Sequence, residues 1–257
     1  SPLDSNAAFG RNGKGRRPNY NHKELKKGGT VMSAVLSAKD IHKVYRTASG
    51  DVHALRGINY DFEEGVFCAI IGRSGSGKST LLHILGGLDR PTSGQVLIRG
   101  KDICSIDDEQ MAIFRRRHLG FVFQQYNLLE EYNVRNNICM PLKLDGKKPD
   151  PAFFDEVIGT LGLQEKVSKF PSELSGGEQQ RAAIARSVLA KPELIIADEP
   201  TGNLDKKTGN EVMSLLTDCV ARFGQTLIVV THDPELAAKA DRIVYIEDGR
   251  VKEDKHR

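Results

Sequence analysis

The segment from Val66 to Leu85 reads VFCAIIGRSGSGKSTLLHIL and contains the strongest structural signal in the sequence. It begins with a short continuous apolar run, which is typical of a buried strand, and it ends with apolar residues that suit a helix. Between them lies a turn in which serine and glycine alternate. A strand, a glycine-rich turn and a helix in this order form a supersecondary unit that holds phosphate groups.

The turn contains the full pattern Gly72-x-x-x-x-Gly77-Lys78-Ser79. In this pattern the glycines let backbone N–H groups wrap the phosphates, the lysine reaches the β- and γ-phosphates, and the hydroxyl binds Mg²⁺. A glycine-rich turn that binds nothing is the alternative, which the flanking strand and helix disfavour. We therefore expect nucleotide contacts at Gly72, Ser74, Gly75, Ser76, Gly77, Lys78, Ser79 and Thr80.

The composition excludes several other classes of protein. The chain has 257 residues, of which 39% are hydrophobic and 28% charged, with a formal net charge of +3. No apolar run approaches the roughly 18 to 20 residues needed to cross a bilayer. The four cysteines lie far apart in sequence, which indicates neither a zinc site nor a disulfide framework. Because Trp is absent and aromatic residues make up 6%, a base-stacking nucleic-acid surface is not supported.

Residues 1–31 differ from the remainder in charge. They hold seven Lys or Arg residues and two acidic ones, among many Asn, Gly and Ser. Such a segment buries too little apolar surface to offset the entropy lost on ordering, so we expect a disordered basic tail. The alternatives are a polybasic arm for anionic lipid or RNA, and an added or translated leader upstream of a biological start at Met32. Residues 32–257 are expected to form the folded domain.

Three kinds of pattern organise the folded domain. Alternating residues between Ala34 and Phe62 predict antiparallel strands. Between about residues 127 and 188 apolar residues recur at helical spacing, which predicts an inserted helical subdomain. Short apolar runs at Leu194–Ala197 and Leu227–Val230 predict buried parallel strands. The predicted fold class is α/β: a P-loop NTPase core of the RecA-like type, with an antiparallel β subdomain and the helical insertion.

Two carboxylates, Asp198 and Glu199, follow the first of these apolar runs. An aspartate at a strand end can hold Mg²⁺ through water, and the next acid faces the position of an attacking water. His232 follows the second run after one residue and is a candidate donor to the γ-phosphate. A solvated strand end and a structural histidine are the alternatives. Together with the phosphate loop, these residues favour hydrolysis of a nucleoside triphosphate.

The segment Leu174–Arg181 reads LSGGEQQR and supplies a second helix start that can bind an anion. One nucleotide does not need two such clamps from one chain. The segment resembles the signature of ATP-binding cassette proteins, in which two cassettes pair head to tail. In that arrangement each signature caps the ATP held by the phosphate loop of the other cassette. The resemblance covers Ala34 to about Lys252, with every family motif present in order.

The resemblance implies further site residues. It assigns ATP contacts to an adenine-stacking Tyr45, to Asp205 across the dimer, and to the signature residues Ser175, Gly176, Gly177 and Glu178. It assigns Mg²⁺ to Ser79, Gln124 and Asp198, and hydrolysis to Glu199, His232 and Gln124. Tyr45 as a packing aromatic and Gln124 as a surface amide are the alternatives.

Three further motifs, at Leu119–Gln124, Pro200–Asp205 and Thr231–Pro234, are similar to those of a bacterial subfamily. Its ATPases serve export of macrolides and antimicrobial peptides, lipoprotein release and cell division. The similarity implies a homodimeric ATPase that uses ATP and Mg²⁺ and drives a separate membrane permease from the cytoplasmic face of the membrane. The chain departs from these relatives at Glu130–Asn137, a stretch that normally abuts the permease.

Two alternative functions agree less well with the sequence. A soluble cassette ATPase acting on ribosomes or DNA would carry two cassettes or long coiled-coil insertions, and neither feature is present in the sequence. A P-loop kinase or GTPase would leave the signature without a role, and the guanine motif Asn-Lys-x-Asp is not found. We therefore expect no nucleic-acid partner.

Overall fold

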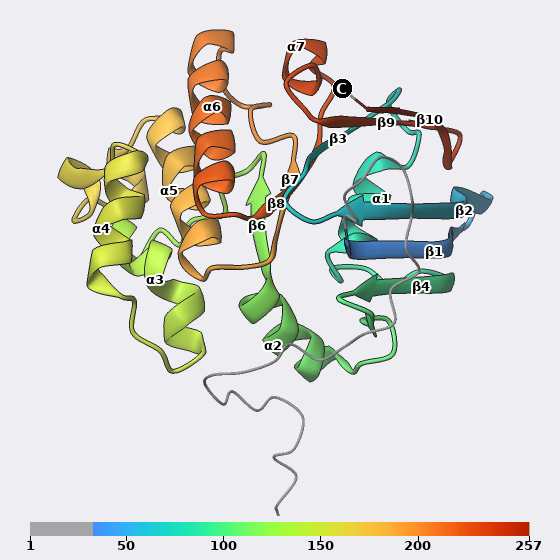
Figure 1. Ribbon diagram of the computed structural model, residues 1–257, viewed down its shortest axis with the longest axis horizontal. Coiled ribbons are helices and arrows are strands. Elements are labelled where there is room, and N and C mark those ends of the chain that lie inside the picture. Colours follow the sequence, from blue (N-terminus) through green and yellow to red (C-terminus); the bar gives the residue numbers. More distant parts are fainter. Residues whose placement is uncertain (1–32, 257) are drawn as a thin grey trace, which may run out of the picture. The chain divides into compact units, whose positions relative to one another are not determined.

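The structure is a computed structural model that describes residues 33–256 (Figure 1). The expectations for residues 1–31 and for a start at Met32 lie outside these residues. The strands are β1 (Ala34–Thr47), β2 (Gly50–Glu63), β3 (Phe67–Ile71), β4 (Ser93–Ile98), β5 (Lys101–Asp102), β6 (Leu119–Phe123), β7 (Leu194–Asp198), β8 (Thr226–Val230), β9 (Arg242–Glu247) and β10 (Arg250–His256). The helices are α1 (Lys78–Leu85), α2 (Asp108–His118), α3 (Val134–Leu144), α4 (Pro151–Thr160), α5 (Gly176–Leu189), α6 (Lys206–Arg222) and α7 (Pro234–Ala237), with 3₁₀ turns at Gln164–Lys166 and Pro171–Glu173.

The larger sheet has the strand order β10-β9-β3-β8-β7-β6, and all its strands except β10 run parallel. All five residues of β8 are buried, as are the first four of β7. Strands that are covered on both faces read as continuous apolar runs, which is why the sequence pattern identified them. Because β3, β8 and β7 are parallel neighbours, their carboxyl ends lie at the same edge of the sheet.

Two hydrophobic cores lie on the two faces of this sheet. Ile195 and Ala197 of β7 belong to the core formed with α3 to α7, whereas Leu194 and Ile196 belong to the core formed with β1, β2, β4, α1 and α2. Figure 1 shows the same division, with α3 to α6 on one side of the sheet and β1, β2 and β4 on the other. The sheet is therefore packed on both faces and provides a firm support for the loops at its edge.

The smaller sheet is antiparallel, with the order β2-β1-β4-β5. The segment between β6 and β7 contains only helices among its regular elements, from α3 to α5. Pro151 occupies the first turn of α4 behind an Asp150 cap, and Ser175 caps α5. The predicted fold class is confirmed: a mixed α/β core, an antiparallel sheet and an inserted helical region. No helix within residues 33–256 is long and apolar enough to cross a membrane.

Candidate functional site

The phosphate loop joins β3 to α1 through backbone conformations that favour glycine. Gly77 precedes α1 with φ of 100°, and Gly72 has φ of 153°. A Cβ atom at Gly77 would lie 2.4 Å from the carbonyl oxygen of Ala54, and one at Gly72 would lie 2.1 Å from that of Ile246. The loop is therefore held in close contact with both β2 and β9, and neither glycine position has room for a side chain.

A cavity of about 380 Å³ lies over this loop. Lys78 Nζ donates hydrogen bonds to the carbonyl oxygens of Gly72 and Arg73, at 3.0 and 2.9 Å. The Ser76 hydroxyl is buried and finds no hydrogen-bond partner in residues 33–256. Glycine-rich backbone ahead of a helix, a lysine and an unpartnered hydroxyl suit the phosphates of a nucleotide. The cavity is lined by Ala54, Gly72, Ser74, Gly75, Gly77, Lys78, Ser79, Thr80, Glu199 and His232.

Ser79, near the start of α1, meets Asp198 at the carboxyl end of β7. Ser79 Oγ donates a hydrogen bond of 3.2 Å to Asp198 Oδ1. His83, one turn further along α1, places Nε2 3.6 Å from Asp198 Oδ2, and the interaction with this carboxylate raises the pKa of His83. Mg²⁺ binds protein oxygens, commonly through one or two carboxylates together with substrate phosphates. Ser79 and Asp198 therefore fit this ion, although the described residues contain no group of three acidic, His or Cys side chains that could hold a metal.

Glu199 follows β7 in a left-handed backbone conformation with φ of 46°. Its N–H donates to the carbonyl oxygen of Val230 at 2.9 Å, which fastens the turn to the end of β8. Glu199 Oε2 lies 2.8 Å from Nδ1 of His232, whose side chain is 75% exposed. The structure thus brings together, around one cavity, two of the three residues expected to carry out hydrolysis.

Gln124, the third such residue, does not line the cavity. Its Nε2 donates to Oδ1 of Asn203 at 2.9 Å, and Nδ2 of Asn203 donates back to the carbonyl oxygen of Gln124 at 3.0 Å. This reciprocal pair directs the amide of Gln124 toward the turn that follows Glu199. Sequence reasoning missed Asn203, because the contact joins residues that are 79 positions apart.

Tyr45 also lies outside the lining residues of the cavity. Its hydroxyl donates to Asp89 Oδ2 at 2.9 Å, Lys43 Nζ lies 4.9 Å from the centroid of its ring, and burial raises the pKa of Tyr45. The residue nevertheless remains 40% exposed.

The signature residues lie at the start of α5, and none of them lines the phosphate-loop cavity. Ser175 and Glu178 form a capping box, in which the N–H of Ser175 donates to Glu178 Oε2 at 2.8 Å. This hydrogen bond and the ion pair with Lys166 lower the pKa of Glu178 to about 2. Asp205 likewise caps α6 by accepting from the N–H groups of Lys207 and Thr208, and it too lies outside the cavity. Gly176 and Gly177 complete this first turn of α5.

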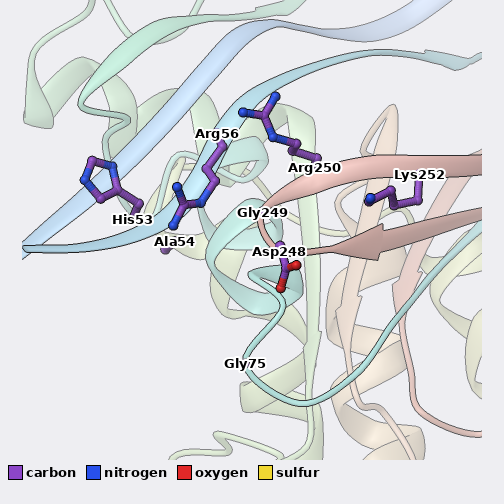
Figure 2. Close-up of a pocket in the computed structure, with 8 residues that line it drawn as sticks. All are labelled: His53, Ala54, Arg56, Gly75, Asp248, Gly249, Arg250 and Lys252. Atoms are coloured by element: carbon purple, nitrogen blue, oxygen red, sulfur yellow. The ribbon is translucent and has the colours of Figure 1, made fainter.

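A second cavity, of about 520 Å³, adjoins the first and shares Ala54 and Gly75 with it (Figure 2). Its lining includes Asp248 and Gly249 of the β9–β10 turn. Gly249 N donates to the carbonyl oxygen of Ser76 at 3.0 Å, and Arg56 N donates to that of Gly249 at 2.9 Å. This turn therefore braces the phosphate loop. Sequence reasoning missed it, although an Asp-Gly pair between two runs is a hairpin signal that could have revealed it.

Comparison with known sequences places the chain in a large family. The family model described as ABC transporter matches residues 55–202. The lipoprotein-releasing system ATP-binding protein LolD of Geobacter metallireducens is 46% identical over 225 residues, which cover 87% of this chain and 100% of LolD. The macrolide export ATP-binding/permease protein MacB of Escherichia coli K12 is 42% identical over 222 residues, which cover 86% of this chain and 34% of MacB.

Solved structures of ABC transporter cassettes are also similar to this chain. A dimeric structure of the bacterial ABC transporter cassette MJ0796 superposes with a TM-score of 0.78 at 38% identity, covering 86% of this chain and 98% of that one. A dimeric post-hydrolysis state of the same cassette, bound to ADP and Pi, has a TM-score of 0.77 at 37% identity. The chain therefore belongs to the ABC transporter family and is one of its ATP-binding, ATP-hydrolysing cassettes.

Proposed function

We propose that this cassette acts as one half of a head-to-tail homodimer that drives a separate membrane permease. The observation that carries the proposal is the division of the site within one chain. The phosphate loop, Glu199 and His232 share a cavity, whereas Ser175 and Asp205, at the starts of α5 and α6, lie outside it. A second copy would supply the signature that completes each nucleotide site, and the dimeric form of a structural relative supports this arrangement.

The expected roles follow from where these groups lie. Lys78 and the glycine-rich backbone bind the phosphates, and the Tyr45 ring stacks on adenine. Ser79 and Asp198 would hold Mg²⁺, which supplies positive charge to the β- and γ-phosphate oxygens. Glu199 orients the attacking water and accepts its proton, and His232 donates to the γ-phosphate as the bond to ADP breaks. Gln124 lies 2.9 Å from Asn203, and its role in water and Mg²⁺ contact would require it to turn toward the cavity.

A permease partner follows from the relatives. LolD is named as the ATP-binding protein of a lipoprotein-releasing system, and MacB joins an ATP-binding part and a permease in one chain. Because LolD, which matches this chain over 100% of its own length, is named as the ATP-binding protein of a larger system, we propose that the permease of this chain is likewise a separate subunit. That partner would hold the cassette at the inner face of the cell membrane. These comparisons do not favour the alternative of a soluble cassette acting on nucleic acid or ribosomes.

Mixing two inactive variants tests the head-to-tail site. Ser175→Arg blocks the signature, and Lys78→Ala blocks the phosphate loop, so each homodimer is expected to be inactive. A heterodimer holds one intact composite site, formed by the phosphate loop of the Ser175→Arg chain and the signature of the Lys78→Ala chain. MgATP hydrolysis should therefore return on mixing. Ser214→Arg, at an exposed serine of α6, is the control for the bulk of arginine and should keep its activity. A mixture as inactive as its components would rule out the composite site.

A further inference from the structure

Gln180 is a buried amide, one turn inside the helix that presents the signature. It is 0% exposed and lies on α5. Its Nε2 donates one hydrogen bond to the carbonyl oxygen of Phe123, at 3.1 Å, and another to that of Pro200. A side-chain amide carries two N–H donors on one nitrogen, and here each donor is directed at a different loop.

Those two loops carry the residues expected to position the attacking water. Phe123 immediately precedes Gln124, and Pro200 immediately follows Glu199. The loops also contact each other directly, through the reciprocal pair of Gln124 and Asn203. The fit is close, since a Cβ at Gly202 would lie 2.8 Å from Nε2 of Gln124. One side chain of the signature helix thus adds a further link between two loops that are also connected by the pairing of β6 with β7 and by the Gln124–Asn203 amide pair.

The energetics of Gln180 favour a geometric role over a stabilising one. Its Oε1 is buried and has no partner among the described residues, and an unsatisfied buried acceptor lowers stability. A hydrocarbon side chain would avoid that unmet acceptor but would leave the carbonyls of Phe123 and Pro200 without their donor. The Gln180 amide therefore suits a role in which it positions the two loops.

We infer that Gln180 is a positioning residue for hydrolysis. It holds the loops that carry Gln124 and Glu199 of its own chain at a fixed position relative to each other. The inference rests on the proposed function, because that proposal assigns Gln124 and Glu199 their roles. Gln180 touches neither nucleotide nor water in this account and acts through the two carbonyls. Its removal should thus lower kcat for MgATP, while the KM for ATP changes little, because the phosphate loop is not disturbed.

Gln180→Met keeps the length of the side chain and removes both donors. We expect kcat to fall by roughly 10-fold or more, since small displacements of reacting groups are costly in rate, with KM for ATP within about 2-fold. Gln225→Met is the matched control. Gln225 is also buried, also has an unpartnered Oε1, and donates to a carbonyl, that of Pro192, at 3.1 Å. It precedes β8, at the opposite end of that strand from the catalytic loops.

Equal losses of kcat in Gln180→Met and Gln225→Met, at matched melting temperatures, would assign the effect to general stability and overturn the inference. Placing Gln180→Met in only one chain of the rescued heterodimer separates an effect on the Gln124 and Glu199 loops from an effect on the signature. In the Ser175→Arg chain, which supplies the phosphate loop and Glu199, it should lower kcat. In the Lys78→Ala chain, which supplies only the signature, it should leave kcat within about 2-fold.

The reverse pattern would show that Gln180 acts by presenting the signature, and equal losses in both placements would show that its effect is not confined to the Gln124 and Glu199 loops. Either result would overturn the inference while leaving the proposed function intact. If the heterodimer without Gln180→Met shows no activity, the proposed composite site fails first, and the role of Gln180 within it fails with it. The two failures are therefore distinguishable in one set of mixtures.

Discussion

Lys78 is the side chain whose removal tests nucleotide binding most directly. Its ammonium group lies in the phosphate-loop cavity, where it now donates to the backbone oxygens of Gly72 and Arg73. Charge-assisted bonds to phosphate in such a site are strong, so Lys78→Ala should weaken ATP binding by roughly 100-fold or more. Titration calorimetry with MgATP measures this loss. Lys239→Ala removes an exposed lysine elsewhere and should bind like the parent protein. Equal affinity in Lys78→Ala and the parent would refute the assignment.

A substitution at Glu199 is expected to affect ATP hydrolysis but not ATP binding at the same cavity. Glu199→Gln keeps the shape of the side chain and its left-handed backbone, but it removes the carboxylate that orients water and accepts its proton. We expect hydrolysis to fall by roughly 10²-fold while ATP affinity survives. The variant should also accumulate as an ATP-bound dimer, which size-exclusion chromatography with MgATP detects. A variant that stays monomeric and hydrolyses ATP normally would contradict the role.

Among the structural elements, the β9–β10 turn acts on the phosphate loop through Gly249. A Cβ there would lie 2.7 Å from the carbonyl oxygen of Ala54, and φ is 71°. Gly249→Ala should therefore displace the turn that bonds to Ser76 and raise the KM for ATP by roughly 3- to 10-fold. Gly100→Ala is a matched control, because Gly100 has φ of 77° and nothing within 4 Å of its Cβ position. Because φ is positive and similar at both positions, the two variants carry similar backbone strain. Equal KM values for ATP in the two variants would therefore show that the β9–β10 turn does not support the phosphate loop.

A second element-level contact, centred on Asp145, joins α2 to the end of α3. The Asp145 side chain is 3% exposed and is paired with Arg116, Arg117 and Lys147. Burial alone would raise the pKa of Asp145, but hydrogen bonds from these three cations hold it well below its usual range. Asp145→Asn should lower the free energy of unfolding by roughly 1–3 kcal/mol at neutral pH, measured by urea denaturation.

The pH dependence of this contact has a definite sign. An acid whose pKa is depressed by folding stabilises the protein above the unfolded value of about 3.9 and loses that contribution as pH falls. The parent protein should therefore begin to lose its advantage over Asp145→Asn below about pH 5, and the loss should continue down to about pH 1, because the folded-state pKa is strongly depressed. Asp155→Asn, at an exposed acid of α4, should match the parent throughout. A constant difference between parent and Asp145→Asn across this range would contradict the ionic origin.

The parts of the fold that depend on local sequence patterns could be predicted from the sequence. The unit from β3 through the phosphate loop to α1 could be predicted because strand, turn and helix follow one another in the chain. β10 could not, since nearly all of its residues are exposed and polar and it lies at a sheet edge. The contacts of Gln180 and Asn203 likewise depend on tertiary packing between segments that are 20 to 79 residues apart. No spacing rule in the sequence reports such contacts.

The surface around Glu130 and Glu131 is a candidate contact site for a partner. Both side chains are exposed in a turn before α3, beside Leu129 and Tyr132, which are 43% and 42% exposed. Asn137, buried at 0% exposure, holds this turn by accepting from the N–H of Leu129 at 2.7 Å and donating to the carbonyl oxygen of Tyr132 at 2.8 Å. A turn that is held in place by a buried asparagine and exposes apolar and acidic side chains suits contact with a partner.

A partner can change the ATPase rate only if it binds the open and closed dimers with different affinity. Reversing charge with Glu130→Lys and Glu131→Lys should therefore leave ATPase activity without permease within about 2-fold and weaken permease binding or its effect on hydrolysis. The matched control is Asp155→Lys with Glu165→Lys, two exposed acids on other parts of the helical region. The measurements are pull-down and ATPase activity with the cognate permease in membranes. If both double variants match the parent in both measurements, the Glu130–Glu131 turn does not belong to the coupling surface.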